Sequence, residues 1–162
     1  MTDTSVNLTP HFKLAEFMPH GATDVPADVR VNLTKVALLL EGVRWHAGLP
    51  LIVHSGWRLA DHNAAVGGAH ESDHLTGSAA DFNVADGSGQ DWITNTYDAF
   101  DYARIQLFGR FGQLILEDHR AYLNNPAKLW VHISLPDVRH PASAATGGVL
   151  VSRSPGHYEG IA

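Results

Sequence analysis

Residues 72–81 read SDHLTGSAAD, and this segment carries the strongest chemical signal in the sequence. It places His74 seven residues before Asp81, with Gly77 between them and two alanines directly before the carboxylate. Gly77 permits tight backbone geometry, and residues 79–84 have the composition of a short strand. The segment therefore predicts a loop that delivers an imidazole beside a strand that presents a carboxylate, and zinc accepts both as ligands.

Strand periodicity identifies further candidate ligands. Catalytic zinc sites usually have three protein ligands and keep one position for water. Alternate residues of a strand face opposite sides of a sheet. In the predicted strands 79–84, 113–118 and 130–135 the apolar side chains mark the core face, which leaves polar side chains on the other face. That open face would carry Asp81, Glu117 and His132, with His74 at its rim: three ligands and one further carboxylate to act as a base.

Each of these residues, taken alone, also fits an ordinary structural or solvated position. The alternation around Asp81 and His132 is what any half-exposed strand shows. The chain has eleven histidines, but they are dispersed and not gathered in a tract, which argues against a small histidine-rich metal buffer. Pattern alone therefore leaves the structural and the metal-binding interpretations open.

Composition restricts the classes of function. The 162 residues are 44% hydrophobic, enough for the core of one domain. A net charge of -6 argues against nucleic-acid binding through a basic surface. There is no cysteine, so a metal must be held by histidine and carboxylate. No apolar run reaches the roughly 20 residues that span a bilayer, and the N-terminal residues lack signal-peptide features, so we expect synthesis in the cytoplasm without membrane insertion.

We expect a single peptidase-sized domain over residues 1–162, with residues 1–10 loose and residues 153–162 forming a flexible tail or an interaction strap. Apolar residues at helical spacing predict one long helix over 29–43, which Gly48 and Pro50 end. Early helices and late strands with short connections predict an α+β fold with a mostly antiparallel sheet. The other expected elements are a strand at 51–54, helices at 59–66 and 91–107, and an edge strand at 148–152.

The segment SDHLTGSAAD matches the SxHxxGxAxD motif of the zinc D-Ala-D-Ala carboxypeptidase and L-Ala-D-Glu endopeptidase family, whose fold is shared with the Hedgehog signalling domain. Residues 54–58, HSGWR, and 63–74, NAAVGGAHESDH, also resemble that family. Residues 111–117, FGQLILE, and 129–134, LWVHIS, are similar to the final strands of its phage and bacterial branch. The resemblance covers roughly residues 10–152.

The resemblance implies a Hedgehog/DD-peptidase-like fold with helices packed on one side of the sheet. It implies one Zn²⁺ held by His74, Asp81 and His132, the set that strand parity also selects. Arg58 and Ser72 match residues that anchor or polarise substrate near the metal in the family. An arginine can bind a carboxylate or a carbonyl oxygen with a geometric fit that lysine lacks.

The sequence departs from the family at one position. Many members carry the catalytic acid three residues before the last histidine ligand, where this chain has Leu129. The branch that it resembles commonly has a glutamate at the end of the preceding strand, which corresponds to Glu117. Asp118 is the second candidate base, although its parity points toward the core. His119 is a third candidate and fits a loop residue.

The predicted activity is metal-assisted amide hydrolysis. Glu117 would take a proton from a water whose pKa the metal lowers to about 7, and Arg58 would help to stabilise the oxyanion. Ser72 would be a positioning group and not a nucleophile. The resemblance implies bacterial peptidoglycan as the partner, and an endopeptidase acting in its stem peptide in preference to a D,D-carboxypeptidase. The protein would be a phage endolysin or a virion component, with other phage proteins as further partners. The competing hypothesis, permitted by Leu129, is a wall-binding module that keeps the fold without catalysis.

Overall fold

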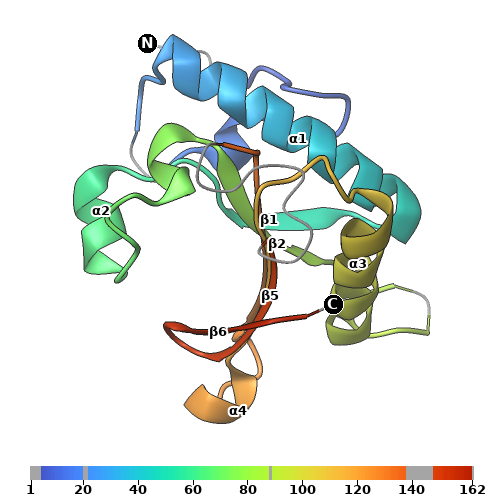
Figure 1. The fold of residues 1–162 in the computed structure, drawn as a ribbon. Helices are drawn as coiled ribbons and strands as arrows, with labels where there is room; N and C mark the ends of the chain where they lie inside the picture. Colours follow the sequence, from blue (N-terminus) through green and yellow to red (C-terminus); the bar gives the residue numbers. More distant parts are fainter. Residues whose placement is uncertain (1–4, 20–21, 88, 138–147, 162) are drawn as a thin grey trace.

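A computed structural model of the chain describes residues 5–19, 22–87, 89–137 and 148–161. A six-stranded sheet with the order β1-β2-β4-β3-β5-β6 forms its centre (Figure 1). Four of the five strand pairs are antiparallel, and only β3 and β5 run parallel. The strands are β1 (Leu51–Ser55), β2 (Ala79–Val84), β3 (Leu114–Asp118), β4 (Leu129–Ser134), β5 (Val149–Ser154) and β6 (His157–Gly160).

The helices agree with the mixed α and β composition expected from the sequence. They are α1 (Ala27–Ala47), α2 (Ala60–Ala65), α3 (Trp92–Gln106) and α4 (Arg120–Leu123), with the short 3₁₀ turns η1 (Leu14–Phe17) and η2 (Asp73–Thr76). Pro26 directly precedes α1, and Gly48 ends it in the left-handed conformation at φ 64°. The long predicted helix is therefore confirmed, including its boundary signals.

The hydrophobic core lies on one face of the sheet, under α1 and α3 (Figure 1). The apolar stripe of α1 is buried, as its spacing predicts, and includes Leu33 and Leu40, which are fully buried. Phe82 of β2 and Val131 of β4 meet these helices from the sheet. Because apolar side chains occupy this face, the alternate residues of the same strands point to the opposite face. That open face carries the polar residues.

The two ends of the described chain are more ordered than the sequence predicts. Residues 1–10 are expected to be loose. Residues 1–4 lie outside the described part of the chain, but Asn7 forms a bridge with Lys13, and Thr9 is buried. The tail predicted over 153–162 instead completes β5 and forms β6, joined by a turn at Gly156 with φ 76°. Its backbone hydrogen bonds form the strand, and its polar sequence gives no apolar alternation to reveal it.

The predicted edge strand at 148–152 is also corrected. β5 lies inside the sheet, between β3 and β6. Its parallel pairing joins Glu117 to Ser152 across neighbouring strands. Among the described residues, no helix is both long and apolar enough to cross a membrane.

Candidate metal centre

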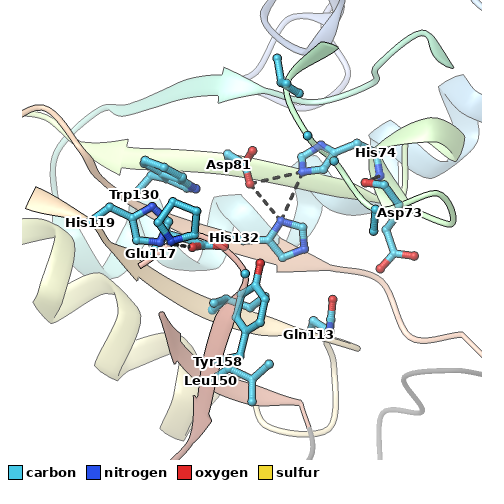
Figure 2. A pocket seen from close by; sticks show the side chains of 18 of the residues that line it. Asp73, His74, Asp81, Gln113, Glu117, His119, Trp130, His132, Leu150 and Tyr158 are labelled. Atoms are coloured by element: carbon cyan, nitrogen blue, oxygen red, sulfur yellow. Dashed lines mark hydrogen bonds and ion pairs between the residues drawn. The ribbon is translucent and has the colours of Figure 1, made fainter. Parts of the chain in front are cut away.

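Three candidate ligands converge on the open face of the sheet, as Figure 2 shows. The Nε2 atom of His74 lies 3.2 Å from Nδ1 of His132 and 3.3 Å from Oδ1 of Asp81. The Nδ1 atom of His132 lies 2.9 Å from the same Asp81 oxygen. Three donor atoms that are distant in sequence therefore form a small triangle.

The size of this triangle fits a tetrahedral ion. Zinc bonds of about 2.0–2.1 Å to nitrogen and oxygen place tetrahedral ligand atoms about 3.3–3.4 Å apart. The three observed separations are within a few tenths of an ångström of that edge length. Two imidazoles and one carboxylate are also a donor set that zinc accepts, so the residues present fit this metal.

His74 is oriented by the turn that carries it. η2 begins after Ser72, whose hydroxyl accepts a hydrogen bond from the His74 backbone N–H at 3.4 Å, and it ends at Gly77 in the left-handed conformation. The Nδ1 atom of His74 lies 2.6 Å from the carbonyl oxygen of Gly56. Because a carbonyl oxygen can only accept, the ring proton lies on Nδ1. The Nε2 atom is then unprotonated, faces the centre and can bind a metal ion.

Gly56, which supplies that carbonyl oxygen, is packed closely against η1. A Cβ at this position would lie 2.7 Å from the backbone oxygen of Phe17, which is too short for any side chain. Trp57 also donates its backbone N–H to that oxygen. The packing of the N-terminal turn onto the strand end therefore fixes the orientation of His74.

Asp81 and His132 are placed by sheet register. They face each other directly on β2 and β4. The second carboxylate oxygen of Asp81 accepts a hydrogen bond from Nη2 of Arg58, whose Nε donates to the Ser55 hydroxyl at 2.8 Å. Burial would raise the pKa of Asp81, but its interactions with His74 and His132 outweigh burial and hold this pKa well below its ordinary value. Asp81 is therefore ionised and can bind a metal cation.

Arg58 and Ser72 thus have structural partners that the sequence does not reveal. Both line the cleft beside the candidate ligands, as expected. Arg58 is engaged with Asp81, and Ser72 caps η2. Their predicted contacts with substrate stay predictions, whereas their contacts with the ligand residues are present in the structure.

Glu117 lies on the same face and is 8% exposed. It pairs with Trp130 on β4 and points into the cleft near His132 (Figure 2). Burial raises the pKa of Glu117, opposed by the charge of His132. Glu117 lies two residue positions along β3 from Ile115, the cross-strand partner of His132. A buried carboxylate with a raised pKa at this distance from a candidate ligand is suited to accept and return a proton.

The competing acid positions lie on the other face. Leu129 is fully packed in the hydrophobic core, so an acid at that position in this strand register would not reach the centre. Asp118 accepts hydrogen bonds from Tyr97 of α3 and from Arg120. The hydrogen bond from Arg120 lowers the pKa of Asp118 to about 2. Asp118 therefore lies on the core side of the sheet, as its strand parity predicts.

The ligand residues line a cleft of about 780 Å³. One wall is the segment between α2 and η2, including Gly68 and Glu71. The opposite wall is the turn between β5 and β6, with Gly156, together with Tyr158 of β6. Tyr158 points its hydroxyl toward the centre (Figure 2). Its pKa is raised by burial and by the charges of Glu117 and Asp81, so the hydroxyl keeps its proton.

Sequence reasoning misses Ser152 and Tyr158 as residues of this site. Ser152 could have been found from strand alternation: its neighbour Val151 is apolar and marks the core face, which predicts Ser152 on the open face. The sequence around Tyr158 gives no such signal, because all four residues of β6 are exposed and no apolar alternation marks one face. His119, expected in a loop, is 5% exposed and contacts Glu117.

Comparison with known families adds an independent observation. A family model described as peptidase M15 matches residues 10–114. This range includes Arg58, Ser72, His74 and Asp81, and it ends before Glu117 and His132. No curated protein matches the sequence.

Proposed function

Because the chain belongs to the peptidase M15 family, a family of zinc metallopeptidases, we propose that it hydrolyses an amide bond in the stem peptide of bacterial peptidoglycan. The observation that carries this proposal is the triangle of His74, Asp81 and His132 beside the buried Glu117. The resemblance of residues 72–81 and 129–134 to the phage and bacterial branch supports the substrate class and a Hedgehog/DD-peptidase-like fold.

The metal would be held by His74, Asp81 and His132, and when bound it supplies the Lewis acid that polarises a carbonyl and acidifies water. Glu117 removes a proton from the attacking water as the water oxygen bonds to the carbonyl carbon. The same carboxyl group then returns that proton to the amide nitrogen as the carbon–nitrogen bond breaks. One carboxyl group can do both because its burial keeps the pKa above that of an ordinary glutamate.

The structure favours cleavage within a peptide over removal of a terminal residue. A carboxypeptidase needs a cationic group free to bind the terminal carboxylate of its substrate. Two cationic side chains line the described part of the cleft, Arg58 and Lys128. Arg58 is already paired with Asp81. Lys128 lies four strand positions from His132, about 13 Å along the strand. The cleft is also bordered by two separate walls, one before η2 and one after β5, as an extended peptide requires.

Purified peptidoglycan incubated with the zinc-loaded protein tests this proposal. We expect soluble fragments whose masses identify one hydrolysed peptide bond, loss of all cleavage after the metal is chelated, and recovery when zinc is added back. Fragments released equally well by the chelated protein would contradict a metallopeptidase.

Binding to the intact wall without any cleavage by the zinc-loaded protein would favour the competing proposal, a wall-binding module. Glu117 favours catalysis over binding alone, because it places a buried carboxylate on the same face as the candidate ligands, where amide hydrolysis needs a general base. The biological setting stays part of the proposal: a phage lysis enzyme that acts after release from the cytoplasm, or a virion component associated with other phage proteins.

A further inference from the structure

Glu117 is held by a small polar cluster at the edge of the cleft. Its Oε2 atom lies 2.9 Å from Nε2 of His119 (Figure 2). The same His119 nitrogen lies 2.9 Å from the hydroxyl oxygen of Ser152. All three residues are buried. A buried polar group is retained in a folded protein when its partners satisfy it, so this arrangement requires a specific proton order.

The backbone explains why the imidazole reaches Glu117. His119 follows β3 at the second position after Glu117, so both side chains emerge on the same face. The backbone N–H of His119 still donates to the carbonyl oxygen of Lys128, which extends the strand pairing by one step. The ring packs edge-on against Trp130, with 5.3 Å between ring centres and an interplanar angle of 80°. The imidazole therefore has little freedom to turn away.

The hydrogen bonds define which atom donates. The hydroxyl of Ser152 donates to the backbone oxygen of Ser154 at 2.9 Å, so its lone pairs are left to accept. Burial lowers the pKa of His119, which favours the neutral ring with one proton. A proton on Nε2 satisfies the Glu117 carboxylate and the Ser152 oxygen at once, whereas a proton on Nδ1 would leave both acceptors facing a lone pair.

We propose that His119 is a positioning residue for Glu117: its Nε2–H, supported by Ser152, holds one carboxylate oxygen and leaves the other directed at the attacking water. This inference rests on the proposed function, in which Glu117 is the base. Fixing a general base in one rotamer raises the turnover rate because the proton transfer needs a defined distance and direction. It does not require contact between His119 and the substrate.

Two substitutions separate positioning from packing. His119→Gln keeps an N–H donor at a place equivalent to Nε2, and His119→Asn keeps one equivalent to Nδ1 only. We expect His119→Asn to lower kcat about 10- to 100-fold with little change in KM or zinc content, the range seen when a partner of an active-site group is removed. His119→Gln should recover most of that loss. Equal losses in both variants, or full activity in His119→Asn, would overturn the proposal.

The proton order can also be read without catalysis. In the zinc-loaded protein with ¹⁵N-labelled histidine, His119 should show the Nε2–H tautomer by NMR, and Glu117→Gln should shift that resonance. An Nδ1–H tautomer, or a His119 resonance that ignores Glu117→Gln, would refute the inference. Since this readout needs no substrate, it distinguishes an error about His119 from an error about peptidoglycan cleavage.

Discussion

Asp81 and His132 are cross-strand partners, and Oδ1 of Asp81 lies 2.9 Å from Nδ1 of His132. Side chains directly opposite on antiparallel strands are the closest neighbours that a sheet provides. The register of β2 against β4 therefore places two of the three candidate ligands, and the η2 turn adds His74 above them.

Removing either histidine of the triangle should abolish zinc binding. We expect His74→Ala and His132→Ala to hold far less than the roughly one ion per chain that a three-ligand site binds, and to lose cleavage in proportion. Elemental analysis of the purified variants measures this. His62→Ala, at an exposed position on α2, is the matched control and should keep both properties. Full zinc content in His132→Ala would show that the metal is held elsewhere.

Glu117→Gln should separate metal binding from catalysis. The amide keeps the size of the side chain but cannot accept the proton, so we expect normal zinc content and a kcat lower by about 10²- to 10⁴-fold. Asp118→Asn on the opposite face should keep its kcat. If Asp118→Asn lost activity in the folded protein while Glu117→Gln stayed active, the assignment of the base would be wrong.

Asp118 should instead contribute to stability in a pH-dependent way. Hydrogen bonding to Arg120 lowers the pKa of Asp118 to about 2 in the folded protein, against about 3.9 in an unfolded chain. Because the pKa is lower in the folded protein, Asp118 stabilises the fold at pH values above its pKa in the unfolded chain. This contribution disappears as the pH falls from about 4 toward 2. Asp118→Asn should therefore lower the free energy of unfolding by about 1–3 kcal/mol at pH 7.

Denaturant titrations at several pH values test this expectation. The difference between the original protein and Asp118→Asn should shrink as the pH approaches 2. Asp98→Asn, at an exposed position of α3, serves as the control and should change little at any pH. A difference that stays constant from pH 7 to pH 2 would argue that the Asp118 charge adds no stability.

Arg58→Lys should weaken zinc binding without removing a ligand. Arg58 donates to Asp81 and to Ser55 from two nitrogens of one planar group, and a single ammonium cannot reach both with the same geometry. We expect the zinc affinity to fall about 10- to 100-fold, measured by competition with a chromogenic chelator. Arg104→Lys, a surface substitution on α3, should have no effect. An unchanged affinity in Arg58→Lys would mean that Arg58 does not orient Asp81 for the metal.

Much of the site follows from the sequence because it obeys strand periodicity. Asp81, His132 and Glu117 alternate with apolar residues, and that alternation alone assigns them to one face. The long helix follows from apolar spacing in the same way. The position of Leu129 in the core is a consequence of the same parity, since it is three residues from His132.

The remainder depends on contacts that local patterns do not encode. Ser152 meets Glu117 only because β5 pairs in parallel with β3, across a connection of more than a dozen residues. His119 directly follows the last residue of β3, so strand periodicity does not predict its burial. Its burial depends on packing against Trp130 of the neighbouring strand. The β6 strand has no buried face, so backbone pairing with β5 forms it without an apolar signal.

Tyr158→Phe tests whether that last strand takes part in catalysis. The hydroxyl lines the cleft opposite the segment before η2 and points toward the centre, and its raised pKa keeps it a hydrogen-bond donor. A donor aimed at the oxyanion is worth about 10²- to 10³-fold in kcat when the site is closed to water. Tyr158 is 50% exposed, so we expect a smaller loss, about tenfold, with unchanged zinc content. Tyr122→Phe, on the exposed surface of α4, should keep full activity. Equal kcat values for Tyr158→Phe and the original protein would restrict β6 to a structural wall of the cleft.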